Sequence, residues 1–378
     1  MHKLQEQCPH CKAALDETTI VEGKQQLHQV TEVVSKPLVQ NYFLAQHKCG
    51  NCGKKSRAAL PPGVPPTAAG PRLQAIITML IAQCHLSRAD VKEALAQMFG
   101  VHLSVGAIHN VTPRAAVGVK PAIDEVARAL VEAATKHCDE TGWRHCNKRA
   151  WLWVVCSQLG AYFHIDERRN REAFGKLLPE LHGVIHTDRW GVYDIIDALL
   201  HQLCHAHLRR DMQALVELKG TGSELGTAFL AASDAMFHVW HRFKAGELDR
   251  AQMQAEMAPV QTNWRALAVL AAAHDHKKVR ALGRDLLKQW DSLWPFLHHD
   301  GAEPTNNHGE RTIRPSVLLR KTNGGTHCET GADFVARMQS VIVTAKCQGV
   351  RLVDWLTGVF EALWAPMPLP MLLPRASG

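Results

Sequence analysis

The stretch HCDETGWRHCNKRAWLWVVCSQLGAYFHID, residues 137–166, contains three consecutive strand patterns. Each run is rich in β-branched and aromatic residues and ends at a short polar or glycine-containing turn. A helical pattern and a fourth strand pattern follow, and residues 200–204 can supply a fifth strand. The predicted strands cover 137–143, 150–158, 161–166 and 183–187, and the predicted helix covers 169–178. This order predicts an α/β fold, a mixed sheet with helices on its faces.

Changes in composition on both sides of this core predict further units. Prolines at 61–66 indicate a stiff linker, and apolar residues at helical spacing over 212–300 predict an all-helical insertion. Prolines near the end of the chain predict a frayed tail. The expected units are a zinc-binding unit at 1–60, the linker at 61–71, a small helical unit at 72–118, the first part of the α/β core at 119–211, the helical insertion at 212–300, the second part of the core at 301–348, and a C-terminal helix and tail at 349–378.

Three short helices are predicted within residues 72–118. Ser87 is placed to cap the second helix and Gly100 to end it, and Ser104 is placed to cap the third. Three helices in this arrangement are similar to a helix-turn-helix. Contact with DNA and a plain three-helix connector are both open interpretations of this unit.

The composition is that of a globular chain. Of its 378 residues, 46% are hydrophobic and 21% are charged, and 43 Lys and Arg against 36 Asp and Glu give a formal net charge of +7. This excess permits a polyanion partner such as nucleic acid without requiring one. No apolar run is long enough for a bilayer or a secretory signal, and 11 cysteines make an odd number for a disulfide framework. We therefore expect a cytoplasmic protein without membrane segments.

Two Cys-x-x-Cys pairs near the start of the chain predict a zinc site. The pairs are Cys8 with Cys11 and Cys49 with Cys52. Strand patterns at 18–22 and 38–44 lie between them, which predicts a β-hairpin unit. Two such turns can place four thiolates around one tetrahedral Zn²⁺. The alternative is four unrelated structural cysteines.

Acidic residues at strand and helix ends predict a site for Mg²⁺ or Mn²⁺. Asp139 lies on the first predicted strand, Asp188 at the carboxyl end of the fourth, and Glu310 at the start of a later helical pattern. If the two strands are neighbours their carboxylates converge, and hard oxygen donors bind these ions well. A metal pair would suit phosphodiester chemistry, and Arg311 and Arg314 are placed to meet phosphates. For either aspartate alone, the alternative is a turn residue at a strand end.

Several motifs, taken in order, resemble those of transposases of the insertion sequence 66 family. The motifs are the two cysteine pairs, Asp139-Glu140-Thr141, Thr187-Asp188 with Gly191 and Tyr193, Cys204-His205-Ala206-His207-Leu208-Arg209-Arg210, Thr305-Asn306-Asn307 followed by Glu310-Arg311, and Arg320-Lys321 with Gly324-Gly325. Each motif is weak alone. Their order and their spread from Cys8 to about Trp364 make the resemblance specific.

The resemblance implies a ribonuclease H-like catalytic core of the Asp-Asp-Glu type, with a helical insertion before the glutamate. It assigns Asp139, Asp188 and Glu310 as the catalytic acids, which would hold two Mg²⁺ or Mn²⁺. The implied activity is hydrolysis of a phosphodiester at the ends of a mobile element, followed by strand transfer. The implied partners are double-stranded DNA, as terminal inverted repeats and target, and further copies of the chain. The residues expected to neutralise DNA backbone charge are Arg311, Arg314, Arg320 and Lys321.

The chain also departs from the family pattern. Family members usually carry a longer amino-terminal region, so the chain is expected to be truncated or a partial element. His205 stands where the family usually has Trp, and Cys204 and His207 either support the active site, bind a metal or pack as structural residues. A non-catalytic DNA-binding remnant and a stand-alone metal-dependent DNA nuclease are therefore alternative functions.

Overall fold

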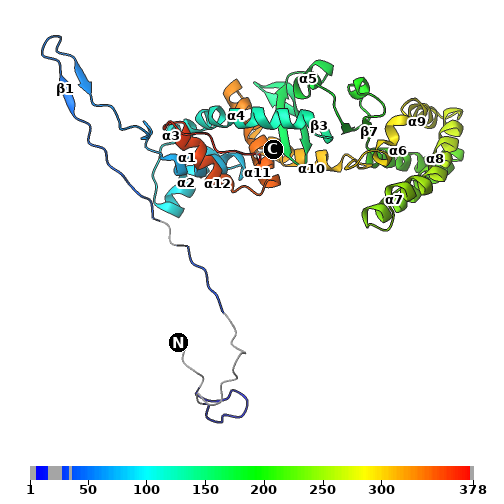
Figure 1. The fold of residues 1–378 in the computed structure, drawn as a ribbon, viewed down its shortest axis with the longest axis horizontal. Helices are drawn as coiled ribbons and strands as arrows, with labels where there is room; N and C mark the ends of the chain where they lie inside the picture. Colours follow the sequence, from blue (N-terminus) through cyan, green and yellow to red (C-terminus); the bar gives the residue numbers. More distant parts are fainter. Residues whose placement is uncertain (1–5, 16–27, 34–35, 375–378) are drawn as a thin grey trace.

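A computed structural model describes residues 6–15, 28–33 and 36–374 of the chain. Its centre is a five-stranded mixed sheet with the order β5-β4-β3-β6-β7 (Figure 1). The strands are β3 (Thr135–His145), β4 (Lys148–Ser157), β5 (Gly160–Asp166), β6 (Val184–Thr187) and β7 (His201–Leu203). β3, β4 and β5 are antiparallel neighbours, while β6 runs parallel to β3 and to β7. The predicted mixed sheet and its five strands are confirmed.

Strand β4 is buried on both faces. A tight turn joins it to β3, and the turn residues 146–147 have φ values of 48° and 61°, as such hairpin turns require. Trp153 and Val155 belong to one core cluster, and Leu152 and Val154 belong to another. Successive side chains of a strand point to opposite faces, so both faces of this sheet need a helical cover.

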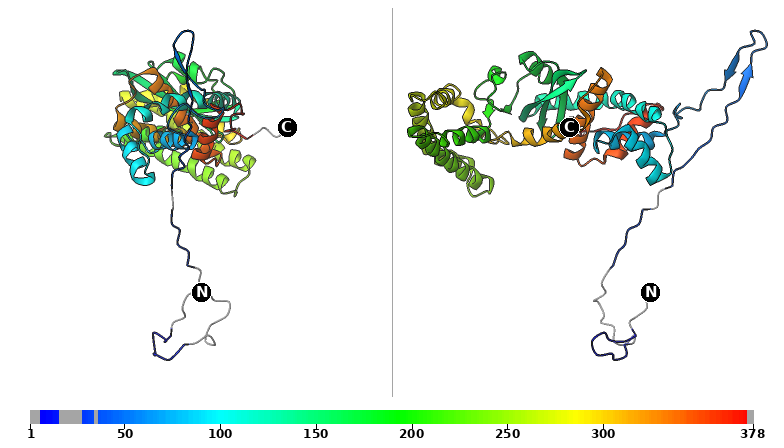
Figure 2. Two further views of the ribbon diagram at one scale, coloured as in Figure 1. Left: turned by 90° about the vertical axis from the view of Figure 1, so that its left-hand side faces the viewer. Right: turned by 180° about the vertical axis from the view of Figure 1, so that it is seen from behind.

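Helices cover both faces (Figure 2). α4 (Val111–Glu132) and α5 (Arg171–Leu177) pack on the face of Trp153. α10 (Asn307–Asn323) packs on the opposite face against β3 and β4. The helix that carries Glu310 therefore lies along the strand that carries Asp139.

The edge strand β5 is covered by α11 (Glu329–Cys347). The backbone N–H of Phe163 donates to Ser340 Oγ at 2.9 Å, and that of Ala161 donates to Thr344 Oγ1 at 3.2 Å. Free N–H groups on an edge strand would otherwise be open to pairing with another chain. Two helical hydroxyls thus close this edge of the sheet.

The small helical unit has the predicted caps. α2 (Arg88–Phe99) begins after Ser87, whose side chain accepts from Asp90 N, and it ends at Gly100 with φ of 64°. Ser104 caps α3 (Val105–His109) in the same way. α3 is shorter than predicted, because α4 begins directly after it and extends back into the unit expected to be separate. α1 (Pro71–Ala82) packs against α12 (Leu352–Ala362), so the unit also contacts the C-terminal helix.

The helical insertion lies beyond β7 at the other end of the molecule (Figure 1). Its helices are α6 (His205–Val216), α7 (Thr221–Lys244), α8 (Arg250–Ala272) and α9 (Lys277–Lys288). The first helix starts at His205, ahead of the predicted start of the insertion at 212. Aromatic and Met side chains at helical spacing, such as Phe229, Met236 and Trp264, form its buried core. Within the described residues no helix is long and apolar enough to cross a membrane.

Two local predictions about the chain ends need correction. The strand expected at 38–44 does not form, and the paired strands are instead β1 (Gln46–Lys48) and β2 (Lys55–Arg57), where a tight turn holds the two segments together. The strand expected at 18–22 lies outside the described residues.

The C-terminal segment is not frayed up to residue 374. Leu372 and Leu373 are buried, and Trp355 Nε1 donates to the carbonyls of Pro370 and Met371 at 3.1 Å.

Candidate active site

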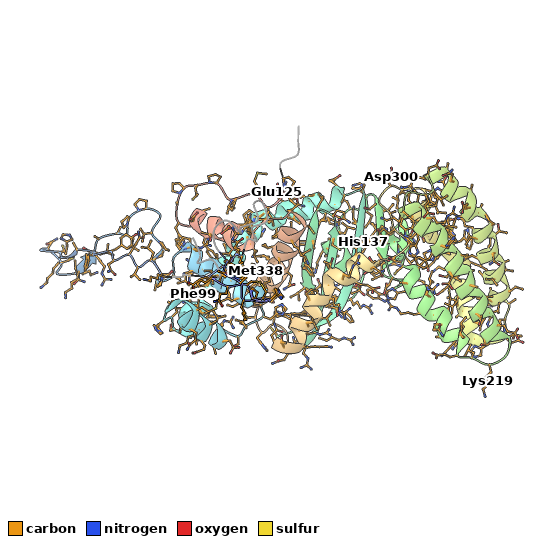
Figure 3. The ribbon with its side chains drawn as sticks, turned by 90° about the horizontal axis from the view of Figure 1, so that it is seen from below. Phe99, Glu125, His137, Lys219, Asp300 and Met338 are labelled. Carbon is orange, nitrogen blue, oxygen red and sulfur yellow. The ribbon has the colours of Figure 1, made fainter. Side chains whose placement is uncertain are left out.

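The two aspartates come from neighbouring strands: Asp139 lies on β3 and Asp188 directly follows β6. In the parallel pair of β3 and β6, the register ends at His137 opposite His186, whose rings stack with centroids 4.1 Å apart. Asp139 follows His137 by two residues on β3 and shares its face, while Asp188 comes directly after the end of β6. Figure 3 labels His137 near the boundary between the sheet and the helical insertion. The expectation that the two strands are neighbours is therefore confirmed.

Asn306 joins the start of α10 to β3 beside Asp139. This buried side chain donates through Nδ2 to Cys138 O at 2.8 Å, and its Oδ1 lies 3.0 Å from His137 Nδ1. The ring of His308, the second residue of α10, lies 5.1 Å from the His137 ring. The first turn of α10, which includes Glu310, thus lies over β3.

The far end of α10 is also fixed to β3. Arg320 Nη1 donates to Gly142 O and lies 3.5 Å from Thr141 Oγ1. Beyond the helix, Thr326 N donates to Arg144 O at 2.9 Å. Gly325 has φ of 109°, and a Cβ there would overlap Arg144 O. Because α10 is held at both ends, the position of Glu310 along β3 is set by backbone contacts.

The three acids interact electrostatically. Burial, together with the negative charges of Glu140, Asp188 and Glu310, raises the pKa of Asp139 to about 7. Carboxylates that disfavour one another's charge accept a bound cation readily. The donor set fits Mg²⁺ or Mn²⁺, because both ions prefer hard oxygen ligands.

Glu140, the next residue of β3, faces the other side of the sheet. Its carboxylate accepts from Arg169 at 2.5 Å and from Tyr193 OH, and only 2% of its side chain is exposed. The Arg169 guanidinium lies over the Trp190 ring, 3.8 Å from its centroid. The contacts with Arg169 and Tyr193 hold Glu140 on the other side of the sheet, while its charge still contributes to the raised pKa of Asp139.

Cys204, His207 and Arg210 of the α6 region surround the Glu310 side chain. Glu310 Oε1 lies 3.4 Å from His207 Nδ1 and 3.3 Å from Arg210 Nη2. Cys204 Sγ accepts from Asn306 N at 3.2 Å. The possible ligand atoms of Cys204, His207 and Glu310 all lie within 4.8 Å of one another. Sequence analysis left the role of Cys204 and His207 open, and the structure brings both to Glu310.

The four basic residues expected to meet DNA fall into two kinds. Arg311, Arg314 and Lys321 are exposed on α10, and they form no salt bridge with any residue that the structure describes. Their spacing of three and seven residues puts them on one side of the helix. Arg320 is half-buried and bound to the backbone of β3, as described above.

The two cysteines of each pair lie close to each other, but the two pairs are not brought together. Hydrogen bonds from the Cys11 and His10 backbone lower the pKa of Cys8, and those from the Cys52 and Asn51 backbone lower the pKa of Cys49. The β1–β2 hairpin lies far from segment 6–15 in Figure 1. Over the described ranges, the four thiols do not form one cluster of possible metal ligands.

Sequence reasoning did not foresee the positioning roles of Asn306 and Gly325. Both lie in motifs that the sequence displays, but a motif does not show which backbone atom a side chain will meet. The only usable signal was local. A glycine directly after a helix-ending glycine often marks a close approach of two backbones.

Comparisons with known proteins show which family the chain resembles. The model of the family described as "Transposase IS66 family" matches residues 66–334, well over half of the chain. Three Sinorhizobium fredii proteins of uncharacterized function are also similar. They are y4jD (26% identity over 57% of this chain and 44% of the relative), y4qI (22% over 60% and 46%) and y4hP (22% over 83% and 63%). The chain thus spans less than two thirds of the length of these relatives.

Proposed function

Since the chain belongs to the transposase IS66 family, we propose that it is a metal-dependent transposase that cuts and joins DNA. The observation that supports the proposal is the pairing of the strand of Asp139 with the strand that precedes Asp188, together with the effect of the Asp188 and Glu310 charges on the pKa of Asp139. The sheet order supports it, because three antiparallel strands followed by two parallel ones is the order of ribonuclease H-like cores. DNA with the terminal inverted repeats of an element and target DNA are the proposed partners, bound by more than one copy of the chain.

In this proposal the three acids hold two Mg²⁺ or Mn²⁺. Bound divalent ions would lower the pKa of the attacking water or hydroxyl and would offset charge on the leaving oxygen. In the first reaction, water adds to phosphorus, the bond between phosphorus and the 3′ oxygen breaks, and that oxygen takes a proton. In the second reaction, the freed 3′-hydroxyl adds to a phosphorus of the target and loses its proton, the bond between that phosphorus and the target's own 3′ oxygen breaks, and the leaving oxygen takes up a proton.

The chain's own residues would position the acids and the DNA. Asn306 and the contacts of Arg320 and Gly325 fix α10 on β3, which would keep Glu310 within reach of an ion held by the two aspartates. Arg311 and Arg314 lie next to Glu310 on an exposed side of α10, where they can neutralise backbone phosphates. We expect Arg320 to contribute through β3, since its guanidinium is already bound to Gly142 O.

Zinc in the amino-terminal unit remains part of the proposal. Each cysteine pair places two thiols at the start of a tight turn, which suits Zn²⁺. Metal analysis of the purified full chain should find one zinc ion per chain, and a Cys49→Ser variant should lose it. A wild-type chain without stoichiometric zinc would remove this element of the proposal.

A products assay tests the proposed function. The full chain is incubated with Mg²⁺, labelled DNA carrying the inverted repeats that flank the gene, and a plasmid target. We expect cleavage at the repeat end and joined products. Cleavage without joining would favour a stand-alone nuclease, and binding without cleavage would favour a DNA-binding remnant.

A further inference from the structure

The first turn of α6 places two metal-binding side chains against Glu310. Cys204 caps this helix and is fully buried, and His207 follows three residues later. Their possible ligand atoms and the Glu310 carboxylate all lie within 4.8 Å of one another. Side chains this close can meet around one ion with small rotamer changes.

The contacts of this cluster leave ligand positions free. His207 Nδ1 is buried and has no hydrogen-bond partner, and it lies 3.4 Å from Glu310 Oε1. Cys204 Sγ accepts one hydrogen bond, from Asn306 N at 3.2 Å. An N–H donor of this kind stabilises a metal-bound thiolate and orients the sulfur. A buried nitrogen without a partner costs free energy, which a bound cation would recover.

The cluster also has an open side. About a third of the His207 and Glu310 side chains is exposed, at 32% and 33%, while Cys204 closes the inner side. Three protein ligands and a water complete the four-coordinate geometry that Zn²⁺ adopts. Arg210, the other partner of Glu310, is 61% exposed and can move into solvent when a cation arrives.

We propose that Cys204, His207 and Glu310 form a binding site for a thiophilic divalent transition-metal ion such as Zn²⁺. A sulfur, an imidazole and a single carboxylate select such ions over Mg²⁺, which prefers oxygen ligands. The site lies beside the proposed magnesium site and shares Glu310 with it. A second group of possible ligands, Glu132, Glu180 and His182, is fully exposed and lacks sulfur, so it carries no comparable argument.

The shared ligand has a consequence that rests on the proposed function. While Glu310 binds a transition-metal ion together with Cys204 and His207, its carboxylate is not fully available to the Mg²⁺ ions that Asp139 and Asp188 would hold. Zn²⁺ at this site would therefore inhibit cleavage that depends on Mg²⁺. The site would make the enzyme sensitive to transition-metal ions through its own catalytic glutamate.

Cobalt titration of the full chain tests the binding directly and needs no DNA. Co²⁺ bound to a thiolate gives a charge-transfer band in the near ultraviolet. We expect Cys204→Ser and His207→Gln each to bind one cobalt ion fewer than the wild type and to lose part of this band. Cys146→Ser, which removes an exposed cysteine beside a histidine, is the matched control and should bind as the wild type does. The cysteine pairs of the amino-terminal unit contribute equally to every protein in this comparison. Unchanged cobalt stoichiometry in both Cys204→Ser and His207→Gln would overturn the proposal.

A second measurement tests the consequence. For each protein, the cleavage rate in Mg²⁺ with added Zn²⁺ is divided by its own rate without Zn²⁺. We expect this ratio to fall well below one for the wild type and to stay closer to one for Cys204→Ser. Equal ratios would refute inhibition through this site. If the wild type does not cleave at all, the proposed function fails, while the cobalt result still decides whether the metal site exists.

Discussion

Asn306 shows how one side chain can place a catalytic group that it does not touch. It bonds to Cys138 O and lies against His137 Nδ1, while its backbone N–H donates to Cys204 Sγ. Three separate segments, β3, α6 and α10, therefore meet at one buried amide. The sequence displays this residue within Thr305-Asn306-Asn307, but only the structure shows which of the two asparagines faces inward.

Asn306→Ala should weaken both the fold and the site. The variant leaves the buried Cys138 carbonyl without its partner, so we expect the free energy of unfolding to fall by about 2–3 kcal/mol. Cleavage of element-end DNA should fall by more than the loss of folded protein explains. Asn307→Ala, which changes an exposed neighbour, is the control and should alter neither quantity. Equal behaviour of the two variants in urea unfolding and in cleavage would contradict the role given to Asn306.

His205 provides a prediction about pH. It is fully buried among aromatic rings of the insertion, its Nε2 lies 2.8 Å from Leu293 O, and burial lowers its pKa to about 4. Since the folded state favours the neutral ring, the stability due to this group is complete above pH 6.5, the ordinary pKa. It is lost as the pH falls from there towards 4, by up to about 3 kcal/mol.

His205→Gln should reduce this acid sensitivity. The amide can still donate to Leu293 O but does not titrate, so the loss of stability between pH 7 and pH 4 should be smaller than in the wild type. Urea unfolding of both proteins across this range, in a chelator, measures the difference. Parallel pH profiles would show that His205 does not titrate on unfolding.

At the scale of elements, α10 and the strands around β3 organise the site. Strand and helix periodicity predicted the sheet, because β4 and its neighbours carry long runs of β-branched and aromatic residues. The same reasoning placed Asp139 on the first strand, and Asp188 and Glu310 at ends of elements. It set the boundary between the small helical unit and the core at 118/119, whereas α4 runs through this point from Val111 to Glu132. Gly118 lies inside α4, where packing requires a residue without a side chain. A Cβ there would lie 2.9 Å from Val359 Cγ1 of α12.

The two glycines after α10 should differ in their response to substitution. Gly324 has φ of 72° with open space around its Cβ position, while a Cβ at Gly325 would overlap Arg144 O. Gly324→Ala should cost about 1–2 kcal/mol of stability. Gly325→Ala should cost more, on the order of 3 kcal/mol, and should also impair cleavage because it displaces the end of α10 from β3. Thermal unfolding of both variants measures these losses of stability. Equal losses would contradict the close approach of Gly325 to Arg144 O.

The exposed arginines of α10 should set the salt dependence of DNA binding. Each phosphate contact removed lowers the slope of log K against log salt by about 1. We therefore expect Arg311→Ala and Arg314→Ala each to reduce the slope by this amount. Arg320→Ala should change protein stability and leave the slope nearly unaltered, because its guanidinium is bound to Gly142 O. Binding measured by fluorescence anisotropy at several salt concentrations tests this, and a reduced slope for Arg320→Ala alone would contradict it.

At the scale of the whole molecule, the sequence predicted the types of unit better than their contacts. Proline content predicted a frayed C-terminus, but Trp355 and the apolar pair Leu372 and Leu373 hold that segment against the core. Contacts of this kind join positions that are distant in sequence, and no local pattern reports them. The modest net charge of +7 likewise gave little guidance. It averages over exposed arginines on α10 and over acids whose charges raise the pKa of Asp139.

The central claim is that Asp139, Asp188 and Glu310 act together as the metal-binding acids of a DNA-cutting site. The most direct measurement is Mg²⁺-dependent cleavage of element-end DNA by Asp139→Asn, Asp188→Asn and Glu310→Gln, with DNA binding measured on the same preparations. Asp234→Asn, which neutralises an exposed acid paired with Arg209 in the insertion, is the matched control. We predict that each of the three variants binds DNA but cleaves at background level, while the control cleaves as the wild type does. Cleavage near the wild-type rate by any one of the three would contradict the claim.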